Sequence, residues 1–409
     1  MQTWFFTEDA YPQLPDQSTY ESIRVNLPNR HYDPVQGADN YHLYVDLWLE
    51  AEACGLEIMV NEHHQTATCV LPAAPLMLAI LARESKTARL LILGNPLANR
   101  NQPVRVAEEM AMIDVISHGR LECGFVRGVP YEAAAANITA FRGAERLWES
   151  HDLILKAWTT HDGPFNFEGR FYRHRQVNIW PRPYQQPHPP VWVTIGSYAS
   201  GAPVAERKYI GAVFLAGYPG IRKVFDGYRD AYFAAHKRPA PLDRLAYAAM
   251  IYVDENPRAA RDGADKLLWY LTSNKIAPPF ANPPGYHPPA VAGDLLRAAV
   301  SGEPRVMPTL DDQMARGNVF AGTPDQVYEQ IKQFWEYSGG FGHLIMMGQA
   351  GFLSREDTVR SMRLFSREVL PRLHELERSY DADRMKALRA STPDRQLNPL
   401  GDFGLEFVR

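Results

Sequence analysis

Two adjacent histidines and a glutamate stand directly after an apolar run, in the stretch Val60-Asn61-Glu62-His63-His64-Gln65. Polar side chains at the end of a buried strand cost free energy unless something uses them. Histidine titrates near neutral pH and can act as a general acid or base. Zinc binding is the competing use, but neighbouring side chains on a regular strand point to opposite faces, which keeps His63 and His64 from one metal. From the residues alone we expect no metal site, and two uses of His63 stay open: an acid–base role, or a core histidine with satisfied hydrogen bonds.

Arg127 is the second candidate, because it ends the apolar run Leu121–Val126. An arginine next to a buried strand is costly unless it has a partner. An ion pair with Glu122 or Glu109 would be a purely structural explanation.

The elements that must position these residues are short apolar runs alternating with helical patterns. Nearly continuous apolar strands separated by helices indicate a parallel sheet covered on both faces, and eight βα units close a barrel. We therefore predict a (β/α)₈ TIM barrel in preference to an open doubly wound sheet. No GxGxxG turn follows the first strand, which argues against dinucleotide binding. The predicted strands are Thr3–Thr7, Glu57–Asn61, Arg89–Leu97, Leu121–Val126, Val191–Ile195, Ala212–Ala216, Leu245–Val253 and His343–Met347. The predicted helices are Tyr41–Ala53, Ala73–Glu84, Pro103–Ile116, Gly143–Thr160, Ala202–Lys208, Ile221–Ala235, Pro257–Thr272 and Pro324–Ser338, the last with a capping sequence at Thr323.

Two segments do not fit eight regular units, although residues 1–409 are expected to form a single domain. Residues 162–190 are rich in proline, aromatic residues and arginine, and we expect an ordered excursion packed on the barrel. Residues 275–317 form a long proline-rich insertion before the last strand, where barrel enzymes keep lids; a surface or dimer-interface excursion is the alternative.

Composition limits the choice of partners. The chain has 409 residues, is 45% hydrophobic and 22% charged, and carries a net charge of −4, so nucleic acid is not an expected partner. Three scattered cysteines without CxxC spacing indicate reduced core residues and favour the cytoplasm. No uncharged run reaches the roughly 18 residues of a membrane span, so no membrane association is expected.

Four segments, in this order and spacing, resemble the bacterial-luciferase-like family of flavin-dependent monooxygenases. They are "NEHH" after the second strand, "NQPVRVAEEMAMIDVISHGRLECGFVRG" (101–128), "PHPPVWVTIGSYAS" (187–200) and "AGTPDQVYEQIKQF" (321–334). The second segment is the most specific, and together the four span most of the chain.

The resemblance implies a two-component enzyme that takes reduced FMN from a separate flavin reductase and reacts it with O₂ through a flavin hydroperoxide. One oxygen atom would enter a small organic substrate, and the chain would be a homodimer. His63 matches the family's active-site histidine, Arg127 its phosphate-binding arginine, and Val129 an apolar residue that packs on the flavin ring. The implied cofactor-binding set is Arg127, Val129, Ser197, Tyr198, Ser200, Gly201 and Asn95. Asn61, Glu62 and His64 are expected to support the site or the fold.

The chain departs from the family in two places. Where members often carry a "SRER" cluster, this chain reads Gly143-Ala144-Glu145-Arg146, so Arg142 or Arg146 is the expected substitute for the second phosphate-site arginine. Light-emitting members have a cysteine where this chain has Val126, which argues against a light emitter. Two alternatives stay open: a deazaflavin-dependent hydride-transfer enzyme, and a barrel that binds flavin without turnover.

Overall fold

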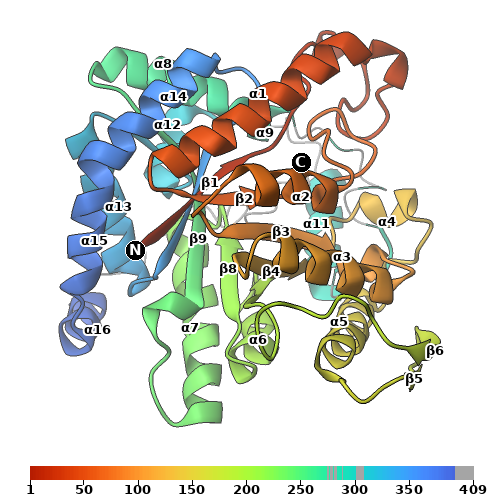
Figure 1. The fold of residues 1–409 in the computed structure, drawn as a ribbon. Helices are drawn as coiled ribbons and strands as arrows, with labels where there is room; N and C mark the ends of the chain where they lie inside the picture. The colour runs from red at the N-terminus through yellow and green to blue at the C-terminus, as the bar shows by residue number, and fades with distance from the viewer. Residues whose placement is uncertain (274–275, 277–279, 281–282, 288, 301–307, 392–409) are drawn as a thin grey trace.

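A closed barrel of eight parallel strands forms the centre of the molecule (Figure 1). The structure is a computed structural model and describes residues 1–273, 276, 280, 283–287, 289–300 and 308–391. Around the barrel the strands follow the order β9-β11-β1-β2-β3-β4-β7-β8, and β8 pairs back with β9. Their bounds are β1 Gln2–Thr7, β2 Glu57–Val60, β3 Leu90–Pro96, β4 Leu121–Val126, β7 Val191–Thr194, β8 Ile210–Phe214, β9 Leu245–Val253 and β11 His343–Gln349. The predicted TIM barrel is confirmed.

Alternation along each strand separates an inner core from an outer one. On β1, Trp4 and Phe6 belong to the core that fills the barrel, whereas Phe5 packs in the layer between strands and helices. Trp192 meets Trp4 edge to face inside the barrel, with ring centroids 5.3 Å apart. Both faces of each strand are therefore buried, which is why the strands read as continuous apolar runs.

Helices surround the barrel. Most of the predicted helices correspond to an observed helix that begins or ends within a few residues of the expected position. They are α1 Pro34–Ala53, α2 Ala74–Glu84, α3 Pro103–Ile116, α4 Glu132–Ala135, α5 Gly143–Thr159, α6 Ala202–Glu206, α7 Gly217–His236, α8 Pro257–Leu267, α9 Trp269–Thr272, α11 Pro289–Val300, α12 Leu310–Arg316, α13 Pro324–Ser338, α14 Arg355–Leu364, α15 Leu370–Arg378 and α16 Ala382–Ser391. The predicted capping box of α13 is present, with Thr323 and Gln326 bonding reciprocally.

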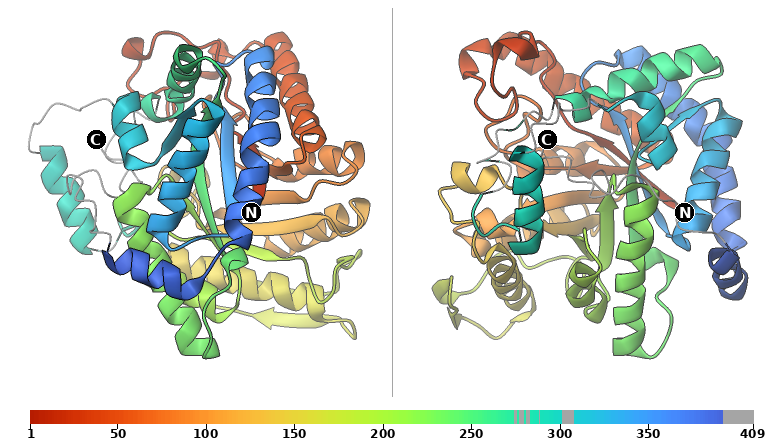
Figure 2. Two further views of the ribbon diagram at one scale, coloured as in Figure 1. Left: turned by 90° about the vertical axis from the view of Figure 1, so that its left-hand side faces the viewer. Right: turned by 180° about the vertical axis from the view of Figure 1, so that it is seen from behind.

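The predicted start of α1 at Tyr41 is wrong by two turns. The helix begins at Pro34, where the Asp33 side chain caps it by accepting from the Val35 amide. The helices α14 to α16 had no counterpart in the prediction, and α14 packs beside the N-terminal helix α1 (Figure 2).

A ninth strand in the main sheet, β10 Val319–Gly322, was also missed. It pairs with the second half of β9 (Met250–Val253), while β8 pairs with the first half (Leu245–Ala248). The insertion 275–317 is thus followed first by β10 and only later by the last strand, β11. In the excursion 162–190 the strands β5 Phe165–Glu168 and β6 Arg173–Val177 form an antiparallel hairpin. Within the insertion, Pro278, Pro279 and Pro288 lie outside the described residues.

Candidate active site

The carboxyl ends of β2 and β4 bring His63 and Glu132 together at the mouth of the barrel. His63 Nδ1 lies 2.8 Å from Glu132 Oε1, and the same oxygen accepts a 3.0 Å hydrogen bond from the His64 amide. Glu132 is the first residue of α4 and its side chain is 1% exposed, while that of His63 is 15% exposed. The pair is thus almost removed from bulk water. The attraction between the two charges is therefore stronger than it would be in solvent.

Each partner stabilises the charged form of the other. Burial lowers the pKa of His63, but the charge and hydrogen bond of Glu132 together with the charge of Glu8 outweigh it, so the pKa lies above its ordinary value. Burial likewise raises the pKa of Glu132, but the charge and hydrogen bond of His63 and the His64 amide lower it by more. With Nδ1 bound to Glu132, Nε2 is the ring atom left to exchange a proton with a ligand.

Glu8 and Arg24 extend this cluster toward β1. Glu8 is buried just after β1 and accepts a 3.2 Å bond from Asn61 Nδ2. Burial raises the pKa of Glu8, and the positive charges of His63 and Arg24 offset part of that rise. Arg24 is fully buried and its Nη1 donates to Thr68 Oγ1 at 2.9 Å, its Nε to the Tyr131 hydroxyl at 3.2 Å. The result is a buried polar network around His63, which fixes the surroundings of the imidazole.

Glu62 and His64 support the fold next to the site. Glu62 is paired with Arg100, lies 2.9 Å from His64 Nε2, and accepts a 3.2 Å bond from the Ala74 amide at the start of α2. His63 and His64 thus turn to different carboxylates. Among the residues that the structure describes, no group of three or more histidine, cysteine or acidic side chains is arranged to hold a metal ion.

Within the described residues no carboxylate pairs with Arg127, so the structural explanation by Glu122 or Glu109 is wrong. Glu122 is paired with Arg89, and Glu109 is paired with Arg105 at 2.8 Å. Arg127 Nη1 instead donates to the main-chain oxygen of Tyr286 at 3.1 Å, and the guanidinium carbon lies 3.7 Å from the centroid of the Tyr286 ring. In the described part of the chain its positive charge is therefore not neutralised by an anion.

Two buried donors without partners belong to residues that adjoin the neighbours of Arg127, and an anion such as phosphate could complete such a set. Asn99 Nδ2 and Arg142 Nη1 are buried and make no hydrogen bond within the described residues. Asn99 faces Gly128, where a Cβ would lie 2.5 Å from Nδ2, and Gly143 faces the Arg127 side chain, where a Cβ would lie 3.3 Å from Cδ. Orphaned buried donors are costly unless a ligand binds them. The residues present therefore fit the phosphate of a flavin mononucleotide.

The two expected substitutes for the second phosphate arginine differ in their contacts. Arg146 donates to the Ala98 oxygen at 3.0 Å and to the Arg100 oxygen at 3.4 Å, so it is used in holding the loop after β3. Arg142 has Nε 3.6 Å from Glu145 and keeps Nη1 without a partner. Of the two, Arg142 is the better candidate.

The predicted second phosphate loop bonds mainly to itself. Ser200 Oγ accepts from the Gly196 and Ser197 amides at 3.1 and 3.0 Å, and the Ser200 amide donates to Ser197 Oγ at 3.2 Å. Tyr198 is 46% exposed and donates to Asp230 on α7 at 2.7 Å, while Gly201 is buried against Tyr228. The helix that follows, α6, has only five residues, so its N-terminus offers little for an anion. None of the loop's hydrogen bonds within the described residues reaches Arg127.

Val129 and Asn95, the other two predicted cofactor-binding residues, have different surroundings. Val129 is half-buried and packs in a small apolar cluster with Tyr131 and the insertion residues Ile276 and Phe280. Asn95 is fully buried, and its Nδ2 lies 3.6 Å from Met110 Sδ on α3, so its amide faces the helical layer. The structure brings Val129 toward the Arg127 side of the mouth and Asn95 away from it.

Sequence reasoning missed Glu8, Arg24 and Glu132, and it named Tyr286 only as a residue of the candidate lid, with no link to Arg127. Glu8 and Glu132 each carried a usable signal: Glu8 follows the first predicted strand, and Glu132 is an isolated acid in an alanine-rich stretch shortly after the fourth. These are the positions from which barrel residues reach the mouth. Arg24 stands in an irregular segment and had no comparable signal.

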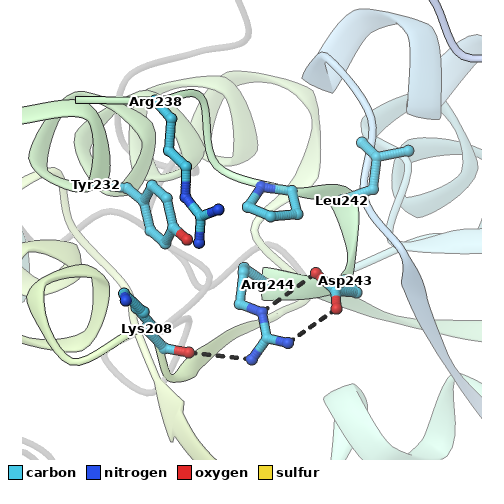
Figure 3. A pocket seen from close by; sticks show the side chains of 7 residues that line it. Lys208, Tyr232, Arg238, Leu242, Asp243 and Arg244 are labelled. Carbon is cyan, nitrogen blue, oxygen red and sulfur yellow. Dashed lines mark hydrogen bonds and ion pairs between the residues drawn. The ribbon is translucent and has the colours of Figure 1, made fainter. Parts of the chain in front are cut away.

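An open surface pocket lies elsewhere in the molecule (Figure 3). It has a volume of about 400 Å³ and is lined by Lys208, Tyr232, Arg238, Pro241, Leu242, Asp243 and Arg244. Arg244 bonds to Asp243 at 2.8 Å and to the Lys208 oxygen at 3.1 Å. Because these residues precede β8 and β9, the pocket is at the amino-terminal end of the barrel, opposite the face where barrel enzymes do chemistry. It is not the candidate active site.

The fold agrees with what comparison with known proteins shows. Residues 23–340 match the family described as luciferase-like monooxygenase, and the chain belongs to this family. It is 33% identical over 157 residues to the oxygenase component of the flavin-dependent trigonelline monooxygenase of Acinetobacter baylyi, a match that covers 37% of this chain and 42% of that relative. The chain thus matches less than half the length of that relative.

Solved structures share the fold. The oxygenating constituent of 3,6-diketocamphane monooxygenase of Pseudomonas putida, a type II Baeyer–Villiger monooxygenase solved with FMN, superposes with a TM-score of 0.66 at 18% identity, covering 90% of this chain and 98% of that one. An F420-dependent secondary alcohol dehydrogenase superposes with a TM-score of 0.63 at 16% identity, covering 91% and 99%. The predicted family is confirmed, and flavin and deazaflavin proteins both occur among the neighbours. In the described part of the chain no helix has the length and apolar character needed to span a membrane.

Replacing Glu132 with glutamine is expected to lower the pKa of His63, because the carboxylate charge that raises it is lost while the amide oxygen can still accept from the His64 amide. The imidazolium form would then give way at lower pH. Glu8, which raises the pKa, and Arg24, which lowers it, remain, so the shift is partial. An NMR pH titration of the His63 ring, assigned with a His63 variant, measures the effect.

Asp152→Asn is the matched control, since it removes the carboxylate 2.8 Å from His151 and leaves the mouth intact. It should leave the His63 titration unchanged. A His63 titration that is the same in wild type and Glu132→Gln would show that the pair does not form in solution.

Proposed function

We propose that this chain is the oxygenase component of a two-component monooxygenase that uses reduced FMN and O₂ to oxygenate a small organic substrate. The observation that carries the proposal is the guanidinium of Arg127, which pairs with no carboxylate among the described residues, together with two buried donors that have no partner there. These donors are Asn99 Nδ2, which faces Gly128, and Arg142 Nη1, one residue before Gly143, which faces Arg127. Such a set suits a phosphate, and FMN carries one next to its ring system. When bound, reduced FMN would supply two electrons and the site of reaction with O₂.

The residues at the mouth take distinct roles in this proposal. Arg127, with Arg142 and Asn99, would hold the phosphate, and Val129 would contribute apolar surface for the ring. His63 would hold or release a proton at Nε2, and Glu132 would keep the ring oriented through Nδ1. Glu8 and Arg24 would keep this part of the mouth polar but closed to water, since both are buried.

A separate flavin reductase is part of the proposal. The relative from Acinetobacter baylyi is named as an oxygenase component, and the chain shows no dinucleotide-binding turn after β1. The second phosphate loop at Ser197, Tyr198, Ser200 and Gly201, a homodimeric assembly and a cytoplasmic location are expectations carried along with this proposal.

The second candidate is a deazaflavin-dependent hydride-transfer enzyme. It is favoured by the buried His63–Glu132 pair, which suits proton transfer next to a hydride acceptor, and by the shared fold of an F420-dependent dehydrogenase. A barrel that binds flavin without turnover is disfavoured by the same pair, since a buried ion pair is costly to keep without a use.

Anaerobic titration separates the candidates. We expect reduced FMN to bind more tightly than reduced F420, and the bound flavin to be oxidised with a time course different from that of free reduced FMN when mixed with aerated buffer in a stopped-flow instrument. Tighter binding of F420, together with FMN oxidation indistinguishable from that of the free flavin, would favour the hydride-transfer enzyme instead.

A further inference from the structure

Tyr286 makes two contacts with Arg127 and one with Gly128, although it lies 159 residues after Arg127 in the chain. Its main-chain oxygen accepts from Arg127 Nη1 at 3.1 Å, its ring lies 3.7 Å from the guanidinium carbon, and its hydroxyl donates to the Gly128 oxygen at 2.8 Å. The insertion therefore contacts both Arg127 and the next residue, at the place where β4 ends.

The local backbone fixes this position. The Tyr286 amide donates to the Pro283 oxygen at 3.1 Å, which closes a turn. Within this turn Gly285 has φ +83°, and a Cβ added there would lie only 2.9 Å from Phe141. A left-handed conformation at a crowded position favours glycine. Residues 283–287 thus form a turn seated on the loop between β4 and α5.

The contact orients Arg127 without neutralising it. A phenol ring attracts a guanidinium through its π face but carries no net charge. Burial raises the pKa of Tyr286, against the lowering effect of Arg127, so the phenol stays neutral near pH 7. The charge of Arg127 remains available, and its N–H groups other than the one bound to Tyr286 remain as donors.

We propose that Tyr286 is a positioning residue for the flavin phosphate. Its ring and main-chain oxygen fix the orientation of the Arg127 guanidinium, and the N–H groups that Tyr286 does not bind are left to donate to the phosphate. A long arginine side chain loses rotamer freedom when it binds, and fixing it beforehand reduces that cost. This inference rests on the proposed function and adds that the insertion completes the phosphate site. The opposite role, in which Tyr286 occupies the place of the phosphate, predicts the opposite sign of effect.

Anaerobic titrations with reduced FMN and reduced riboflavin test the proposal. Tyr286→Ala removes the ring and the hydroxyl, and we expect it to weaken FMN binding about 5–30-fold with riboflavin changed less than about twofold. Tyr286→Phe keeps the ring over Arg127 and loses only the bond to Gly128, so a smaller loss of about 2–5-fold is expected. Tyr184→Ala is the control, since it also removes a tyrosine ring. Tyr184 is 58% exposed and contacts His118, which lies before β4 and so at the opposite end of that strand from Arg127.

A double-mutant cycle with Arg127→Ala separates the failure of this inference from that of the proposed function. If Tyr286 acts through Arg127, adding Tyr286→Ala to Arg127→Ala should cost almost no further FMN affinity. An Arg127→Ala protein that binds FMN as the wild type does would overturn the phosphate site itself. If Arg127→Ala loses FMN selectively but Tyr286→Ala tightens FMN binding, or weakens FMN and riboflavin equally, only the positioning role is overturned.

Discussion

Replacing His63 with alanine is expected to lower oxygenation of a substrate by about 10²–10⁴-fold, the usual range for loss of an acid–base group, while FMN affinity stays within about 1 kcal/mol. The reason is that His63 is bound through Nδ1 to Glu132, which leaves Nε2 for proton exchange, whereas the proposed phosphate site is built around Arg127, which makes no hydrogen bond to His63 in the described part of the chain. Hydrogen peroxide released per reduced FMN oxidised should rise, because reducing equivalents no longer end in product. Both quantities are measured with a substrate that the wild-type protein oxygenates.

Alanine at position 63 also leaves Glu132 buried without its cationic partner, which destabilises proteins by roughly 3–5 kcal/mol. His63→Asn is therefore a needed companion, since its amide can still donate to Glu132 but cannot titrate. His64→Ala is the matched control: it keeps the main-chain amide bound to Glu132 and removes only the side chain paired with Glu62. Unchanged coupling of flavin oxidation to product in both His63 variants would remove His63 from the mechanism.

Arg127→Ala is expected to weaken binding of reduced FMN by about 2–4 kcal/mol, as for loss of a charge-assisted phosphate contact in a partly desolvated site. Riboflavin has no phosphate and should bind nearly as it does to the wild type. Isothermal titration calorimetry under anaerobic conditions measures both affinities. Arg127→Lys restores a charge but not the planar fork and should recover only part of the loss.

Arg105→Ala provides the control for loss of a positive charge, because Arg105 is 69% exposed on α3 and pairs with Glu109. It should change neither affinity by more than about 0.5 kcal/mol. Equal losses of FMN and riboflavin affinity in Arg127→Ala would instead assign Arg127 to the support of the fold.

Local patterns in the sequence were enough for the barrel. A strand buried on both faces must be apolar along its length, so each of the eight barrel strands was visible as a short run, and the capping box at Thr323 marked the start of α13. β10 was not visible, because four residues beside a nine-residue partner strand leave little periodicity to detect. The end of β2 also gave His63 directly, since polar residues after a buried strand stand out.

The partners of these residues were decided only by the tertiary structure. The sequence alone placed Arg127 at the end of a strand but left open a carboxylate partner, and the structure assigns Glu122 to Arg89 and sets Tyr286 beside Arg127. Likewise, the union of His63 with Glu132 depends on two different strands ending at the same face. Propensity and periodicity describe a residue's neighbours along the chain, whereas the pKa of His63 and the free charge of Arg127 depend on groups 69 and 159 residues away. Closure of the barrel is what brings those groups into contact, and it is a property of the whole chain.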